Sequence, residues 1–279
     1  MNKAEVEQNA TATKTARRVN RPLWTRLPRL VRYAVLLGVL IVLWQLCVAI
    51  MDPPALPGPP EVAGAFVEGW MARGYLAAAT WKTLGVLAAG MSIGVALGGL
   101  LAILASWTKI GDDLLTLLAR ILDAIPAIAV LPLLVLWLGT TPFSLVPVAA
   151  CAVVWPVAIK LRAGLKSVDP TIVMVGQNLG LLGWEMARHV LLPSVLPHAI
   201  SGARTGWAYG WRAIVAAGLV LCVADEKPGF FTDGAGGLLE APELLAGLLS
   251  LALVGILVEA PFGLLERHTV VRWGMNAKA

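Results

Sequence analysis

The sequence predicts an all-α polytopic membrane protein with six transmembrane helices. Of its 279 residues, 58% are hydrophobic and 14% are charged, and the mean hydropathy is +0.78. An ordinary soluble domain has roughly 25% charged residues. Six apolar stretches are long enough to cross the roughly 30 Å core of a bilayer as helices. They lack the alternating pattern of transmembrane strands, so we expect helices rather than a closed barrel.

The six predicted spans cover most of the chain. They are Tyr33–Met51, Thr83–Trp107, Leu114–Leu138, Phe143–Leu161, Leu196–Val223 and Leu244–Leu265. The first span follows 32 polar residues, a longer tail than the n-region of a secretory signal, so we expect it to remain as an anchor. The expected organisation is a basic tail at residues 1–32, a transmembrane domain at residues 33–266 and a C-terminal tail at residues 267–279.

The distribution of Lys and Arg predicts the orientation, because these residues resist translocation when they flank a span. The N-terminal tail carries eight of them, and the segment from Lys160 to Arg204 and the C-terminal tail are also basic. The connections at residues 52–82 and 224–243 are richer in Asp and Glu. Six spans with both termini in the cytoplasm satisfy every one of these assignments, whereas five or seven spans break at least one.

The long internal connection begins with a helix start signal. Asp169 can accept hydrogen bonds from free amides, and Pro170 occupies the first helical position, where its missing N–H costs nothing. Apolar residues then follow at helical spacing, namely Ile172, Val175 and Leu179. We therefore expect a short helix after Asp169.

A turn and a second short helix complete this connection. Gly180-Leu181-Leu182-Gly183 interrupts the helical pattern, which resumes at Trp184–Leu192. We expect the second helix to end before Pro193, because proline cannot continue the hydrogen bonding. The segment 169–193 is therefore predicted as a helix, a turn and a helix at the cytoplasmic surface. Such a pair can lie in the membrane interface or be held by a cytoplasmic partner, and the pattern favours neither.

The same segment resembles the EAA loop in the membrane subunits of bacterial ATP-binding-cassette (ABC) importers. That signature is Glu-Ala-Ala, three residues, Gly, nine residues and Ile-x-Leu-Pro, and Gly180, Val190 and Leu192-Pro193 fit its spacing. Three further stretches are similar to the nitrate, sulfonate and taurine permeases of that family: Leu56–Val62, Ala124–Gly139 and Trp211–Ala213. The likeness covers about residues 50–270 and implies the fold of a type I ABC importer permease in the bacterial inner membrane.

The resemblance also implies which residues meet the ATPase. The expected coupling residues are Asp169, Gly176, Asn178, Gly180, Gly183, Val190, Leu192 and Pro193. Two departures from the family pattern stand out: Met174-Val175-Gly176 replaces Glu-Ala-Ala, and Ala217-Gly218 stands where Ala-Glu commonly follows the Trp-Arg-Ala element. In the family, the loop Glu helps to order the loop and its contact with the ATPase, so its loss bears on the strength of coupling.

The function implied by the resemblance is that of a permease subunit that does not itself hydrolyse ATP. It would work as a homodimer, with two cytoplasmic ATPase subunits that bind ATP and Mg, and with an extracytoplasmic solute-binding protein that faces the Gly-rich segment Pro228–Gly237. The chain has no GxxxxGK[ST] phosphate loop, so we expect no nucleotide or other cofactor in it. Membrane lipids are the other expected partner, and nothing points to nucleic acid.

Charged residues inside a span are costly, so each suggests a function. Arg212 lies mid-span beside Trp211 and can either neutralise an anionic solute or meet a carboxylate of another helix. These two residues and Pro126 form the expected substrate pathway. Arg120 and Asp123 are three residues apart on one helix face, and we expect them to pair with each other.

Other residue types suggest structural roles. Glu259 and Glu266 are expected to extend to the lipid headgroups. Gly90, Gly94 and Gly98 stand four apart and permit close approach of a neighbouring helix. The three cysteines lie in apolar runs and are expected as small buried hydrophobes: Cys47, Cys151 and Cys222. The three histidines lack metal-ligand spacing, so no metal site is expected: His189, His198 and His268.

Two other classes of function compete with an ABC permease. An ion- or proton-coupled secondary transporter predicts an essential acid near the membrane midplane and an inverted repeat between halves, and neither is evident. A scaffold or membrane enzyme would need catalytic motifs, such as GxSxG or a pair of carboxylates at depth, that the sequence lacks.

Overall fold

The computed structural model describes residues 28–51, 56–139, 141–225 and 240–266. It divides into two units, residues 1–59 and residues 60–279. Helices dominate, and the described ranges contain no strand. Most of the basic N-terminal tail, the C-terminal tail and the Gly-rich segment Pro228–Gly237 lie outside the described residues, as do the side chains of Cys222 and Glu266.

In the first unit, the predicted first span forms a single helix, α3. It runs from Arg29 to Met51 and is apolar over almost its whole length. Residues Leu30–Ile50 are long and apolar enough to cross a membrane. Large apolar side chains are exposed on all sides of α3, so the helix has no polar face of the kind that a surface helix of a soluble protein shows.

The second unit is a bundle of long helices joined by shorter ones. In chain order they are α4 (Pro59–Val67), the π-helical turn η1 (Glu68–Ala72), α5 (Tyr75–Ser106), α6 (Lys109–Asp123), η2 (Ala127–Val130), α7 (Leu131–Leu138), η3 (Pro142–Ser144), α8 (Leu145–Lys166), α9 (Pro170–Asn178), α10 (Trp184–Met186), the π-helical turn η4 (Ala187–Leu191), α11 (Leu192–Asp225) and α12 (Ala241–Glu266).

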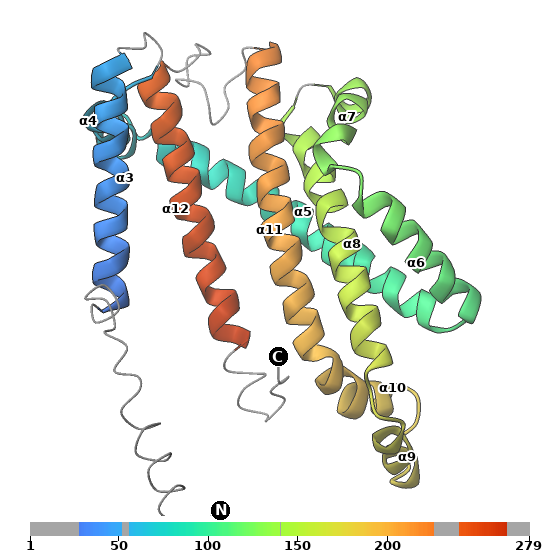
Figure 1. The fold of residues 1–279 in the computed structure, drawn as a ribbon. Helices are drawn as coiled ribbons and strands as arrows, with labels where there is room; N and C mark the ends of the chain where they lie inside the picture. Colours follow the sequence, from blue (N-terminus) through green and yellow to red (C-terminus); the bar gives the residue numbers. More distant parts are fainter. Residues whose placement is uncertain (1–27, 52–55, 140, 226–239, 267–279) are drawn as a thin grey trace, which may run out of the picture. The chain divides into compact units, whose positions relative to one another are not determined.

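Helix α8 forms the centre of this unit, because α5 and α11 both pack along it (Figure 1). On the α5 side, the glycines at positions 90, 94 and 98 lie against α8. A Cβ at Gly94 would lie 2.5 Å from Val153 Cβ, and one at Gly98 would lie 2.6 Å from the Val154 carbonyl oxygen. No larger residue fits at these distances, so the predicted packing role of the glycine stripe is confirmed.

A second glycine stripe, which sequence reasoning missed, brings α11 against the same helix. Its members are Gly202, Gly206 and Gly210. A Cβ at Gly206 would lie 3.0 Å from Val153 Cγ1, and one at Gly210 would lie 3.2 Å from Val153 Cγ2. Small residues on α5 and α11 therefore allow both helices to approach the β-branched face of α8.

The third predicted span, Leu114–Leu138, is not one straight helix. Its two halves, α6 and η2–α7, meet at an angle of 85°. The break has a local cause: Pro126 has φ −55° and ψ 125°, and the residue before a proline avoids the α conformation. Pro126 also lacks the N–H that a continuous helix would use.

Four helices meet the criterion of length and apolar composition for a membrane span, or five if the bent pair counts as one. They are α3, α5, α8 and α12, together with α6–α7 as the bent pair. Helix α11 covers the predicted stretch Leu196–Val223 and has 34 residues, but its described part does not meet that criterion. The predicted helices are thus present. By length and composition, four or five of the described helices qualify as membrane spans, and the predicted number of six is not reached.

The expectation of buried cysteines is wrong for Cys47 and Cys151, since both are exposed. Each lies on a helix face that the described residues of its own unit leave exposed. In a membrane protein, lipid or another subunit can cover such a face, so an apolar run in the sequence does not require burial within the chain.

Candidate functional site

The segment 169–193 begins as predicted. Asp169 is the N-cap of α9, and its carboxylate accepts a hydrogen bond of 2.8 Å from the Thr171 N–H. This backbone hydrogen bond stabilises the charged form and lowers the pKa of Asp169 below its usual value. Pro170 occupies the first helical position. The predicted helix start is therefore confirmed.

Gly180 ends α9 in a Schellman motif. Its N–H donates to the Gln177 carbonyl at 2.9 Å, and the Leu181 N–H donates to the Gly176 carbonyl at 3.0 Å. This pattern requires a left-handed residue after the helix, and Gly180 has φ +80°. The glycine in the signature thus has a local reason, because a residue with a side chain is strained at this conformation.

Gly176 joins α9 to the second half of the segment. It is buried, and a Cβ there would lie 2.9 Å from Met186 Cε and 3.3 Å from Val190 Cγ2. Met186 is itself only 8% exposed. The thioether of α10 therefore lies over the one residue of α9 that has no side chain, and the segment forms a packed pair of helical pieces.

The second helix does not end before Pro193. The π-helical turn η4 continues directly into α11, which includes Pro193 as its second residue. Proline is tolerated in the first turn of a helix, and a π-helical turn changes the hydrogen-bond spacing just before it, so the missing N–H does not stop the chain. The prediction of an end is wrong, and the segment is joined to α11 without a break.

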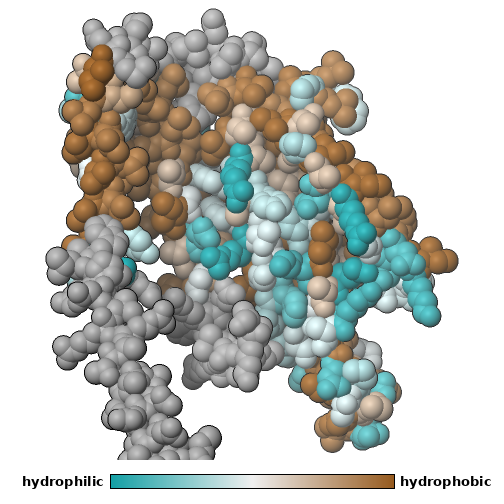
Figure 2. Space-filling model, viewed as in Figure 1, coloured by the Kyte–Doolittle hydropathy of each residue, from teal (hydrophilic) through white to brown (hydrophobic). Residues whose placement is uncertain are grey.

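The packed segment leaves many apolar side chains exposed. They include Ile172, Met174, Val175, Leu179, Leu182, Trp184 and Leu192. Leu179 and Trp184 are 74% and 77% exposed, and the expected coupling residue Asn178 is also exposed. At the lower end of α8 and α11, the space-filling view shows this mixture of hydrophobic and hydrophilic atoms (Figure 2). This surface has no cover within the described part of the chain.

A separate cleft of about 490 Å³ lies among α6, η2, α8 and α11. Its lining is mostly apolar and consists of Leu122, Asp123, Ile125, Pro126, Ala127, Ile128, Val130, Cys151, Ala152, Trp155, Tyr209, Arg212, Ala213 and Ala216. The break at Pro126 shapes one wall, because the chain bends there by 85° and η2 then packs against α8 and α11. Two of the predicted pathway residues, Pro126 and Arg212, thus lie in one cleft.

Two opposite charges face this cleft. Asp123 is the last residue of α6, and Arg212 lies on α11 with its guanidinium carbon 5.6 Å from the centre of the Tyr209 ring. Within the described residues, neither Asp123 nor Arg212 forms an ion pair. The expected pairing of Arg120 with Asp123 is therefore wrong: the shared helix face does not bring their charged atoms together.

Trp211, the third predicted pathway residue, does not line the cleft. Its ring stacks on that of Trp207, with centroids 5.9 Å apart and planes 16° apart. It also lies against α12, where a Cβ at Gly255 would be 2.8 Å from its Nε1 atom. Trp211 packs α11 against α12, whereas the next residue, Arg212, turns to the cleft.

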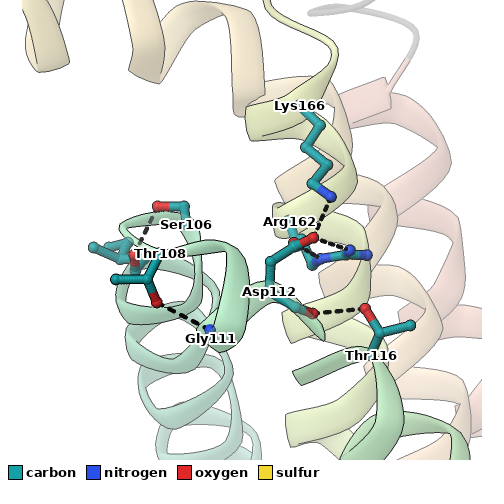
Figure 3. Close-up of polar contacts among 8 residues, drawn as sticks. Ser106, Thr108, Gly111, Asp112, Thr116, Arg162 and Lys166 are labelled. Carbon is teal, nitrogen blue, oxygen red and sulfur yellow. Dashed lines mark hydrogen bonds and ion pairs between the residues drawn. The ribbon is translucent and has the colours of Figure 1, made fainter. Parts of the chain in front are cut away.

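An ion-pair cluster that sequence reasoning missed ties α6 to α8 (Figure 3). Arg162 donates two hydrogen bonds to the Asp112 carboxylate, from Nε and from Nη2, and the Nη2 bond is 2.7 Å long. Lys166 donates to the same carboxylate. The side chains of Arg162 and Asp112 are 20% and 17% exposed. Their separation of 50 residues left no local signal for this pairing.

Further polar contacts attach α12 to the rest of its unit. Glu259, expected at the lipid headgroups, instead accepts a hydrogen bond of 2.9 Å from Arg204 of α11. Arg73 forms ion pairs with Glu68 and Glu243, and the Trp70 indole donates to the buried Ser250 hydroxyl at 2.9 Å. These contacts fix η1 and α11 against α12.

Comparison with known proteins agrees with the fold and with the resemblance in the sequence. Residues 94–269 match the model of the family described as "Binding-protein-dependent transport system inner membrane component". The chain is 29% identical over 242 residues to the taurine transport system permease protein of Escherichia coli, with 83% of this chain and 86% of that protein covered.

Two further relatives align over most of their length. The riboflavin transport system permease protein of Chloroflexus aurantiacus is 30% identical over 241 residues, with 86% of this chain and 88% of that protein covered. The nitrate import permease protein of Synechocystis is 28% identical over 272 residues, with 94% and 98% covered. The family match extends over more than half of the chain, so the protein belongs to the inner membrane components of binding-protein-dependent transport systems, the ABC importer permeases.

Proposed function

We propose that this chain is the membrane-spanning subunit of an ATP-driven importer that moves a small anionic or organic solute inward by alternating access. Two copies form the transport path across the bacterial inner membrane, each with six spans and both termini in the cytoplasm. Two ATPase subunits bind ATP and Mg on the cytoplasmic side, and a solute-binding protein delivers the solute from outside. The chain has no nucleotide site in this assembly and is not itself an enzyme.

The observation that carries this proposal is the construction of the segment 169–193. It presents exposed apolar residues to a partner, and its two halves are packed together through Gly176 and Met186. It also continues into α11 without a break, and α11 supplies Arg212 to the cleft. A force applied to this segment therefore reaches the cleft through one helix.

Alternating access needs two packings of similar free energy, between which a partner can shift the population. The glycine stripes of α5 and α11 against α8 support this requirement, since contacts between small residues leave few interlocking side chains to resist a shift between helices. Substitutions that damage the segment 169–193 are therefore expected to uncouple solute transport from ATP hydrolysis while the fold is retained.

Recovery of an active ATPase tests the proposal. The full chain, tagged and extracted in mild detergent from its own organism, should recover a protein whose ATP hydrolysis in the eluate is blocked by vanadate. Replacing the exposed Leu179 and Trp184 by Asp should remove that activity from the eluate, because the new charges would be buried without partners.

A matched control for each of the two substitutions made singly is Ile110→Asp, which adds one negative charge at a residue that is 81% exposed but lies outside the segment 169–193. It should leave ATPase recovery unchanged. Solute uptake by the purified chain alone in liposomes, driven by an ion or proton gradient, would contradict the proposal and favour a secondary transporter.

A further inference from the structure

The helical stretch from α4 through η1 has three different sides. One side packs inward, where Val62 and Gly69 are buried and Trp70 is half-buried. A second side is exposed and carries the carboxylates of Glu61 and Glu68. The third side is exposed and uncharged, and its residues recur at about every turn of the helix: Pro60, Ala63, Gly64, Val67 and Met71.

The inward side holds η1 beside a part of α12 that can lie in a membrane. The Trp70 indole donates a hydrogen bond of 2.9 Å to the hydroxyl of the buried Ser250. Ser250 follows the first residue of α12 by about 13 Å along the helix axis, at 1.5 Å per residue. It lies within Ala241–Leu265, which is long and apolar enough to cross a membrane. The turn η1 therefore lies beside this span and not beyond its end.

Further contacts fix η1 against the first turns of α5 and α12. Arg73, which follows η1, forms an ion pair of 3.2 Å with Glu243 in the first turn of α12. A Cβ at Gly69 would lie 2.5 Å from Leu76 Cδ1, so the backbone of η1 packs closely on the start of α5. The position of η1 in depth is thus set by both helices.

This end of the bundle is opposite the segment 169–193. Gly90 of α5 meets Ala149 of α8, and Gly98 meets Val157, so the two helices run in the same direction. Because α8 leads into the segment 169–193 at its last residue, α5 begins at the other end. The stretch α4–η1 therefore lies at the membrane surface opposite that segment.

The uncharged outer side has the properties of a surface that lipid covers. Met71 and Val67 are 84% and 53% exposed. Around Ser250, α12 itself exposes only aliphatic side chains, namely Leu248, Leu249, Ala252 and Leu253. Lipid acyl chains cover such side chains without complementary shape or charge, whereas the carboxylates on the second side need water or headgroups. A helix in the membrane interface satisfies both requirements at once.

We propose that α4–η1 is an interfacial anchor that binds bilayer lipid. Val67 and Met71 lie against the acyl chains, while Glu61 and Glu68 lie among the headgroups and water. Trp70 fixes the depth of this anchor through Ser250. The inference goes beyond the proposed function, since it concerns neither the ATPase nor the solute.

Bimane fluorescence of the full chain in lipid nanodiscs tests the proposal. The three native cysteines are replaced by serine, and one new cysteine is introduced and labelled with bimane, as Val67→Cys, Met71→Cys or Ala72→Cys. All three positions are exposed, so the label displaces no buried side chain. The quenchers are phosphatidylcholine with bromine atoms near the top of the acyl chain and iodide in the water.

Brominated lipid should lower the fluorescence of the Val67→Cys and Met71→Cys labels about twofold, because an interfacial helix buries its apolar face by about 5–10 Å. Iodide should have little effect on them. Ala72→Cys is the matched control: Ala72 is the neighbour of Met71 but lies one turn after Glu68, so iodide should quench its label more than brominated lipid does. Ile256→Cys, at a residue of α12 that is 68% exposed, gives the reference for a label in lipid.

Three outcomes would overturn the proposal. Quenching of the Val67→Cys and Met71→Cys labels by iodide alone would place this side in water. Protection of both labels from both quenchers would show that protein covers it, as a second copy of the chain would. Equal quenching of the Met71→Cys and Ala72→Cys labels would mean that the stretch has no lipid side. The experiment uses no ATPase, so it is independent of the test of the proposed function.

Discussion

Gly164 of α8 lies against the base of the His198 side chain of α11. A Cβ at Gly164 would be 2.7 Å from His198 Cβ and 2.9 Å from His198 Cγ. These residues lie where α8 leads into the segment 169–193 and α11 returns from it. The close contact therefore holds the two ends of this segment together, and motion of the segment is passed to both helices.

Replacing Gly164 by Val should separate α8 from α11 at this point. The added atoms have no free space, and overpacking of this kind typically lowers the free energy of unfolding by about 1–3 kcal/mol. The loss should appear as a lower Tm of the full chain in detergent. Gly218→Ala is the control, because nothing lies within 4 Å of a Cβ at Gly218 in α11; an equal loss in both variants would contradict the assigned contact.

Gly94→Ala should destabilise the contact between α5 and α8. The new Cβ would lie 2.5 Å from Val153 Cβ, so the helices must move apart at a cost of about 1–3 kcal/mol. Gly85→Ala in the same helix meets no atom within 4 Å and should be neutral or stabilising by up to about 1 kcal/mol, because alanine favours helix more than glycine does. Thermal unfolding followed by tryptophan fluorescence measures both, and a stabilised Gly94→Ala variant would refute the close approach.

Removal of the Asp112 carboxylate should loosen α6 from α8. Arg162 and Lys166 would lose their shared acceptor, so Asp112→Ala should lower the Tm and speed proteolysis between α5 and α6. Asp113→Ala is the matched control, since it removes an equal charge from the next residue, which forms none of the ion pairs found within the described ranges. If both variants unfold at the same temperature, the cluster has no role in holding α6.

The cap at Asp169 should depend on pH in a defined direction. Its pKa is lower in the folded chain, so its contribution is complete above the usual Asp range and is lost as the pH falls through the lowered folded value. Hydrogen exchange of the first amides of α9 should therefore be slow at neutral pH and faster, relative to intrinsic exchange, in strong acid. Asp169→Asn should keep the protection without this acid dependence, whereas Asp169→Ala should lose the protection at every pH.

Met174 offers a test of what replaced the acidic residue of the loop. It stands at the first position of the Glu-Ala-Ala element and is 54% exposed. A partner surface that is complementary to the apolar Met174 side chain offers no opposite charge to a charged residue at this position. Both Met174→Glu and Met174→Lys should therefore reduce ATPase recovery, and Met174→Leu should retain it. Stronger recovery with Met174→Glu would show that the partner kept a binding site for the acid.

Local signals were sufficient for several features of the segment 169–193. Asp169, Pro170 and Gly180 act on neighbouring backbone groups, and caps and turns of this kind depend on only a few adjacent residues. Pro193 does not end the helix as its residue type predicts, because the effect of a proline depends on the hydrogen-bond spacing before it, which the π-helical turn η4 changes. Roles of the segment in coupling stay predictions until a partner is recovered.

The sequence by itself determined that this is a helical membrane protein of the ABC importer permease kind. The lengths of the apolar stretches, the distribution of charged residues and the order of the motifs can all be read from neighbouring residues. Only the tertiary structure decided that the third stretch bends at Pro126, that Trp211 packs on α12, and that Asp123 and Arg212 face one cleft. The physical reason is range. A helix depends on hydrogen bonds over four residues, whereas a cleft depends on the rotation and close approach of helices whose residues are far apart in sequence.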